Sequence, residues 1–303
     1  MRMGSGSNDM QKLWIYDDAQ NWGRALLDTA RKDGYFDAHL FEEISQPDEG
    51  YLFFHMHHHP QVRARHKYMM GQFALNPKLT LIPNYQSAML YDNKLEQAKA
   101  LSRWMPRTYV FTTPGSARRF IDSTLFFPFI SKSSEGASSH NVRFIQSYEE
   151  AKLEIKYAFS DIGIAGRYGA RQRGYLIWQE FIEGNDYDIR VLAIGRQRLM
   201  LKRYNRSDRP MASGSGHNEP INALDGEAFE ALQFANEFFR EEKQTWSGID
   251  LVRRGDGQWY MLECTVGWTV DGYKNCLFHG SNRKGSDIWK VLLEEIKAGV
   301  FKP

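Results

Sequence analysis

The sequence predicts a mixed α/β protein. Short apolar stretches of strand length alternate with stretches of helical spacing in the front third, whereas later short stretches come in pairs around turns. The alternation predicts a parallel sheet, and the paired stretches predict antiparallel sheet with packed helices. Two such units in one chain predict at least two subdomains with a cleft between them, where ligands usually bind.

Composition limits the function classes. Of the 303 residues, 42% are hydrophobic and 25% are charged, which are typical values for a folded globular chain. The net charge of +2 gives no support for nucleic-acid binding through bulk charge. Cys264 and Cys276 lack metal-type spacing, which argues against a disulfide scaffold. No run of about 18 apolar residues occurs, so we expect no membrane partner and a cytoplasmic location.

The front third is expected to form three strands and three helices. Residues 1–10, rich in Gly and Ser, are expected to be a disordered lead-in. One helix is capped by Asn21 and stopped by Gly34. The expected strands are 13–16, 51–54 and 79–82, and the other expected helices are 61–75 and 91–104.

The remaining two thirds are expected to be richer in hairpins. Turns at 195–198 and 254–257 each join two apolar stretches. The expected strands are 126–131, 142–146, 175–181, 189–194, 199–204, 249–252 and 259–262. The expected helices are 148–159, 225–242 and 287–296.

Lys132 ends one expected strand and is followed by a loop of small residues that reaches position 141. The backbone N–H groups of such a loop can approach phosphates closely, and the lysine adds a positive charge. The spacing is not that of a P-loop. The alternative is an ordinary exposed loop between two strands.

A second candidate segment runs from Gln179 to Arg190. Backbone groups at the end of its first strand could bind an adenine edge, and Asp186 or Asp188 could accept hydrogen bonds from ribose hydroxyls. The planar guanidinium of Arg190 suits phosphate or carboxylate. The alternative is a solvated surface turn.

Asp250 and Glu263 fall on neighbouring strands of the last hairpin. Two adjacent carboxylates repel each other unless a cation lies between them, and Mg²⁺ prefers oxygen ligands. The alternative is that each acid pairs with a base such as Arg253 or Lys202.

The joint order of these motifs resembles the ATP-grasp superfamily. A lysine is followed by Lys132 with its small-residue loop, then by QEFIEG with D-x-R, G-x-D and L-E-x-T. The similarity spans about residues 92–267, and the group that resembles the chain most is the glutamate-ligase-like one that modifies ribosomal-protein tails. The resemblance implies two α+β subdomains that bind ATP between them, preceded by a small parallel-sheet domain. It implies limits of 11–92 for that domain, 93–178 for the first subdomain with a phosphate loop at 132–141, and 179–303 for the second.

The resemblance also implies roles for particular residues. Lys94 and Lys132 would contact the phosphates, and Arg190 would hold the transferring group. Lys202 or Arg203 would face the nucleotide, because strand alternation turns one of them inward. The adenine hinge would be Gln179, Glu180, Phe181 and Ile182, with Asp186 preferred to Asp188 for the ribose.

Magnesium, with Mn²⁺ as an alternative ion, would be held by Asp250 and Glu263. The family usually ends its acidic strand with Glu-x-Asn, whereas this chain has Thr265 at the third position. A threonine hydroxyl is a weaker magnesium ligand than an amide carbonyl, so the departure concerns a second metal more than ATP.

The resemblance implies an ATP-dependent ligase that joins a carboxylate to an amine through an acyl phosphate and releases ADP and phosphate. The substrates would be small molecules or peptides. Two alternatives are a phosphotransferase of the same fold and a non-catalytic nucleotide- or nucleic-acid-binding protein. The basic hairpin 190–209 is either a solvated face or an attachment point for an acidic or nucleic-acid-linked acceptor. The histidines of segment 55–59 are expected to face the substrate cleft or solvent rather than bind zinc.

Overall fold

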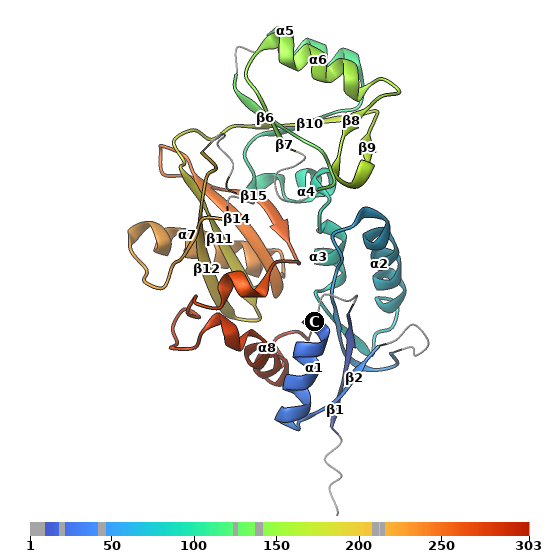
Figure 1. Cartoon of the computed structure of the whole chain (residues 1–303), viewed down its shortest axis with the longest axis vertical. Helices are drawn as coiled ribbons and strands as arrows, with labels where there is room; N and C mark the ends of the chain where they lie inside the picture. The colour runs from blue at the N-terminus through green and yellow to red at the C-terminus, as the bar shows by residue number, and fades with distance from the viewer. Residues whose placement is uncertain are drawn as a thin grey trace, which may run out of the picture.

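Three larger β-sheets and one two-stranded ladder organise the described part of the chain, and helices pack against the larger sheets (Figure 1). The structure is a computed structural model, and it describes residues 10–17, 22–41, 47–123, 127–136, 142–207, 212 and 216–302. Residues 1–9 of the expected disordered lead-in lie outside the described residues. Residues 137–141 of the expected phosphate loop also lie outside them. None of the helices in the described part of the chain is long and apolar enough to span a membrane.

The front sheet is parallel, as the alternating pattern predicts. Its strands lie in the order β2 (Phe36–Leu40), β1 (Gln11–Tyr16), β3 (Gly50–Phe54) and β4 (Leu79–Ile82). Helices α1 (Trp22–Asp33) and α2 (Pro60–Phe73) belong to this domain. β2 was not predicted, because it is a short edge strand with polar residues at two of its five positions.

The single helix expected over 91–104 is wrong. The structure has α3 (Tyr85–Leu90), α4 (Lys94–Ala100) and a 3₁₀ turn (Ser102–Trp104) instead. Asp92, with φ of 45°, breaks the helix, and the Asn93 side chain caps the next one by accepting from the Glu96 N–H. The break places Lys94 at the first position of α4.

The central sheet is antiparallel, in the order β5 (Thr108–Phe111), β10 (Leu176–Glu180), β6 (Phe129–Lys132) and β7 (Val142–Ile145). Helices α5 (Pro114–Ser123) and α6 (Tyr148–Ala158) pack on it around Trp178. A small ladder of β8 (Ile164–Ala165) and β9 (Arg171–Gln172) lies beside them. Neither β5 nor α5 was predicted. Pro and Gly at the start of α5 are typical of turns, which hid this helix.

The third sheet contains both predicted hairpins. Its antiparallel order is β13 (Asn218–Pro220), β12 (Gln197–Tyr204), β11 (Tyr187–Ile194), β14 (Trp246–Arg253) and β15 (Trp259–Thr265). Helix α7 (Gly226–Glu241) shares a hydrophobic core with this sheet. Two 3₁₀ turns (Val270–Tyr273 and Gly285–Asp287) and α8 (Ile288–Lys297) follow.

The front domain and the third sheet share one hydrophobic core. Trp22 of the front domain packs against Trp268 and Trp289, with ring centroids 5.8 Å apart in both cases. Helix α8 lies beside α1 at this junction (Figure 1). The central sheet has a separate core, so a cavity can form where it meets the third sheet.

The turn between β11 and β12 yields a stability prediction. Gly195 has φ of 61°, and a Cβ atom there would lie 2.5 Å from Oε2 of Glu295 and 2.7 Å from its Cβ. Gly299 has φ of 73° and open space around it. Gly299→Ala should lower the free energy of unfolding by about 1 kcal/mol through backbone strain alone. We expect Gly195→Ala to lower it clearly more in chemical denaturation, and equal losses would contradict the predicted clash.

Candidate functional site

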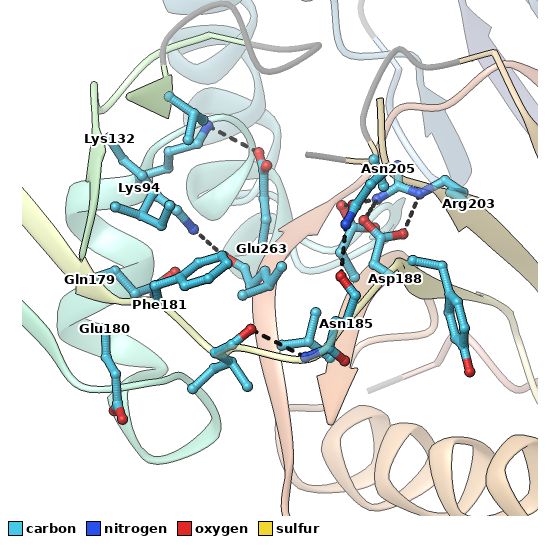
Figure 2. A pocket seen from close by; sticks show the side chains of 18 residues that line it. Lys94, Lys132, Gln179, Glu180, Phe181, Asn185, Asp188, Arg203, Asn205 and Glu263 are labelled. Atoms are coloured by element: carbon cyan, nitrogen blue, oxygen red, sulfur yellow. Dashed lines mark hydrogen bonds and ion pairs between the residues drawn. The ribbon is translucent and has the colours of Figure 1, made fainter. Parts of the chain in front are cut away.

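A cavity lies between the central sheet and the third sheet, and side chains from both surround it (Figure 2). The sequence-predicted residues that line it are Lys94, Lys132, Gln179, Glu180, Phe181, Ile182, Asp188, Arg203, Asp250 and Glu263. The other lining residues are Ile130, Val142, Asn185, Tyr187, Asn205, Ala212, Val252 and Leu262. The lining therefore combines apolar walls with cations and carboxylates.

Four candidate residues are not among those that line this cavity. Asp186 is exposed, whereas its neighbour Asp188 is buried and lines the cavity. Lys202 lies on the opposite face of β12 from Arg203, with its ammonium 3.9 Å from the ring centroid of Tyr187. Of the two residues between which the sequence left the choice open, Arg203 is the one that lines the cavity.

Thr265 and Arg190 make contacts within the third sheet. The Thr265 hydroxyl donates to the Gly267 carbonyl at 2.8 Å and accepts from the Gly267 N–H at 3.2 Å. It is therefore bound to its own turn, and nothing in this geometry directs it to a metal. Arg190 lies opposite Asp250 in the pairing of β11 with β14.

The two lysines bridge the two sheets. Lys94 Nζ donates to the Gly136 carbonyl at 2.9 Å and to Glu263 Oε1 at 3.1 Å. Lys132 Nζ donates to the Leu262 carbonyl at 2.9 Å. Both ammonium groups thus lie next to the same short segment of β15, and Figure 2 shows them gathered with Glu263 on one side of the cavity.

Burial acts on both lysines, with opposite net results. Burial lowers the pKa of Lys132 to about 8, and the nearby Lys94 charge adds to this although Glu263 opposes it. Burial also disfavours charge on Lys94, but the carboxylates of Glu263 and Asp92 outweigh it and raise the pKa. Protonation of Lys94 is thus favoured by its surroundings, whereas the positive charge of Lys132 lowers the free energy of unfolding.

Two arginines neutralise the acids of the third sheet. Arg190 donates to Asp250 through Nε at 2.5 Å and Nη2 at 2.7 Å. Arg203 donates to Asp188 at 2.6 and 2.7 Å, and its Nη2 also lies 2.7 Å from Asp250 Oδ2. Burial would raise the pKa of Asp250, but the two guanidinium groups outweigh it and hold the pKa well below its ordinary value.

The connection from β10 to β11 carries residues that the sequence analysis missed. Asn185 donates to the Ile182 carbonyl at 3.2 Å and to the Arg253 carbonyl at 2.9 Å, and it accepts from the Arg253 N–H. Arg254 donates to Glu180 Oε1 at 2.6 Å. These contacts fix the expected adenine hinge against the β14–β15 turn. The sequence signal for Asn185 was its position after Gly184 in a polar turn, but this signal could not reveal the contact with Arg253, which is distant in sequence.

The carboxylates of Asp250 and Glu263 are suitable magnesium ligands, but that of Asp250 is already bound by arginine. Asp250 and Glu263 lie directly opposite each other on β14 and β15. Both oxygens of Asp250 accept from arginine, whereas Glu263 is partly exposed and lines the cavity. In the described part of the chain, no group of three or more His, Cys, Asp and Glu side chains could hold a metal. The pair therefore fits an ion that is shared with ligand phosphates, which is the usual mode for Mg²⁺.

The histidine segment and the basic hairpin are largely occupied by internal contacts. The His59 N–H donates to His57 Nδ1 at 2.9 Å, and the His59 ring lies 4.7 Å from that of Tyr168. On the hairpin, Arg196 pairs with Glu295 at 3.1 Å, in addition to the pairs of Arg190 and Arg203. The hairpin is therefore not a free basic face in its described part.

Fold and site together place a cavity lined by two lysines, an arginine and several carboxylates between two antiparallel sheets. A family model for the ATP-grasp domain matches residues 91–265. The chain belongs to the ATP-grasp family, and the resemblance and the fold class expected from the sequence are confirmed.

Solved structures extend the likeness to the front domain. A RimK domain protein ATP-grasp from Sphaerobacter thermophilus is 13% identical, with a TM-score of 0.60, 94% of this chain covered and 99% of that one. A RiPP-associated ATP-grasp ligase from Chryseobacterium gregarium, in complex with ADP and a leader and core peptide, is 14% identical, with a TM-score of 0.62, 96% of this chain covered and 97% of that one. The macrocyclase MdnC from Microcystis aeruginosa, bound with precursor peptide MdnA, is 12% identical, with a TM-score of 0.59, 93% of this chain covered and 99% of that one. Identities this low show a shared fold, and no curated protein sequence matches the chain.

The two lysines yield opposite stability predictions. Because the folded state lowers the pKa of Lys132 to about 8, the unfolded chain binds that proton more tightly and the full penalty is present below pH 8. Lys132→Met should therefore raise the free energy of unfolding at pH 7 by up to about 3 kcal/mol. The gain should shrink as the pH rises from 8 toward 10.

Lys94→Met is the matched comparison, because it leaves Glu263 without its ammonium partner. We expect it to lower the free energy of unfolding by about 3 kcal/mol at pH 7. Denaturant titrations at several pH values measure both changes. Destabilisation of similar size by both variants would contradict the charge assignment.

Proposed function

We propose that the chain is an ATP- and Mg²⁺-dependent ligase that joins a carboxylate to an amine and releases ADP and phosphate. The observation that carries the proposal is the convergence of Lys94, Lys132 and Glu263 on one cavity of an ATP-grasp chain. Among the structures of similar fold, the ATP-grasp ligase PsnB was solved with its minimal precursor, Mg and ADP, which supports the nucleotide and the ion.

The roles of the residues follow from charge and position. Lys94 and Lys132 neutralise the phosphates, since they are the ammonium groups that line the cavity. The adenine lies at the hinge of Gln179 to Ile182, next to apolar side chains such as Ile130 and Val252. Asp188 replaces Asp186 as the carboxylate on this side of the cavity.

A metal ion would be held by Glu263 and Asp250 and would supply charge neutralisation for the phosphates. For Asp250 this requires an arginine to give up one of its carboxylate contacts. The guanidinium groups of Arg190 and Arg203, which contact Asp250, could then turn to the phosphoryl group. We therefore propose that they hold this group during its transfer.

The proposed reaction has two bond exchanges. An oxygen of the substrate carboxylate attacks the γ-phosphorus of ATP, the bond to the β-phosphate oxygen breaks, and ADP leaves. The nitrogen of the amine then attacks the carbonyl carbon, the C–O bond to phosphate breaks, and the amine loses a proton. The protein positions the reactants and excludes water from the acyl phosphate.

The substrate classes are small or peptide carboxylates and amines. The proteins of similar fold include a D-cycloserine synthetase as well as ligases solved with peptides. An acidic or nucleic-acid acceptor at the basic hairpin is not proposed, because Arg190, Arg196 and Arg203 pair with carboxylates within the protein. We keep 11–92, 93–178 and 179–303 as the proposed domain limits.

The test is a screen of amino acids, small acids and peptides for acid-dependent ADP formation, followed by the product mass. We expect an amide-linked product and a loss of at least about 100-fold in rate for Glu263→Gln, because the proposed magnesium ligand loses its negative charge. Glu230→Gln is the matched control, since Glu230 lies on α7 and pairs with Arg253 at 3.0 Å outside the cavity lining.

Other outcomes would contradict the proposal in distinct ways. A stable phosphorylated product that forms without an amine would identify a phosphotransferase. Equal inactivity of the wild type and of Glu263→Gln across the whole screen would favour a non-catalytic binding protein.

A further inference from the structure

A buried arginine of the front domain contacts the nucleotide-binding subdomain. Arg63 lies on α2 and is 2% exposed. Its Nη1 donates to Asp92 Oδ2 at 2.6 Å and to the His58 carbonyl at 2.8 Å, and its Nη2 lies 3.1 Å from Glu135 Oε2. A buried guanidinium is stable only when it is paired in this way. Glu135 belongs to the expected phosphate loop, so Arg63 joins that loop to the front domain.

Asp92 has contacts on both sides. Its Oδ2 accepts from Arg63, whereas its Oδ1 accepts from the Gly136 N–H at 2.7 Å and lies 3.5 Å from Lys94 Nζ. The same carboxylate thus connects α2 with the backbone of the phosphate loop and with a cavity lysine. Its backbone, with φ of 45°, is held in the left-handed region that few residues other than glycine adopt.

Lys94 therefore has two carboxylates within reach. Glu263 Oε1 lies 3.1 Å from its ammonium on the cavity side, and Asp92 Oδ1 lies 3.5 Å away on the other side. Arg63 already neutralises Asp92, which leaves the ammonium directed to the cavity. Without the guanidinium, Asp92 would be a buried carboxylate with Lys94 as its nearest described cation, and it would attract the ammonium away from the cavity.

We propose that Arg63 is a positioning residue for nucleotide binding, which acts through Asp92 to keep Lys94 directed into the cavity and Gly136 in place. The inference rests on the proposed function, because it assumes that the cavity binds ATP. Arg63 itself is not among the residues that line the cavity. It gives the front domain control over the nucleotide site in the neighbouring subdomain.

The test measures binding of AMPPNP with Mg²⁺ by calorimetry, together with thermal unfolding, for R63M, D92N and the double variant. Asn at position 92 tolerates the left-handed backbone and can still accept from the Gly136 N–H. We expect R63M to lose at least about tenfold in affinity, because the uncompensated Asp92 competes for Lys94. The double variant should return to within about threefold of the wild type, because the competing charge is gone.

The control is R31M, which changes an exposed arginine on α1 of the same domain and should bind as the wild type does. Wild-type affinity in R63M, or a double variant as weak as R63M, would overturn the inference. A wild-type protein that does not bind AMPPNP would overturn the proposed function and this inference with it. If R63M does not fold, the double variant carries the test, and a tenfold loss in it would overturn the inference.

Discussion

The structure depends on mutual neutralisation of buried charges where the central sheet meets the third sheet. Lys94 reaches from α4 to Glu263 on β15, and Lys132 at the end of β6 reaches the backbone of the same strand. Each ammonium group lies 3.1 Å or less from an oxygen of β15, and both lysines are buried, so water screens their charges only weakly. Any ligand that enters must offer these groups partners as good as those they lose.

Triphosphate with a divalent ion meets that condition. The phosphates offer anionic oxygens to the ammonium and guanidinium groups, and the ion offers positive charge to the carboxylates that are released. In the proposed function, binding would then be an exchange of partners rather than the burial of new unpaired charge. The cost of holding Lys132 charged in a buried position would become useful at this step, which is a common reason for local instability at functional sites.

The sequence revealed the strand ends that carry this chemistry, because strand periodicity and turns are local signals. Asp250 lies within its expected strand, whereas Lys132 and Glu263 lie one residue past the expected ends of theirs and inside β6 and β15. Both hairpins were found. The sequence analysis preferred Asp186 to Asp188, but Asp186 precedes β11 and is exposed, whereas Asp188 on β11 is buried and lines the cavity. Local signals left Lys202 and Arg203 open, because that choice depends on which face of the strand meets the central sheet. Arg63 and Asn185 were missed, since their partners are far away in sequence and their roles exist only in the folded chain.

The most direct test of the partner exchange is a crystal structure with AMPPNP and Mn²⁺, in which the anomalous signal locates the ion. We expect the ion to be coordinated by Glu263, with the Lys94 ammonium moved from that carboxylate to a phosphate oxygen. A Lys94–Glu263 contact that persists at its present 3.1 Å, with the ion bound elsewhere, would contradict the exchange.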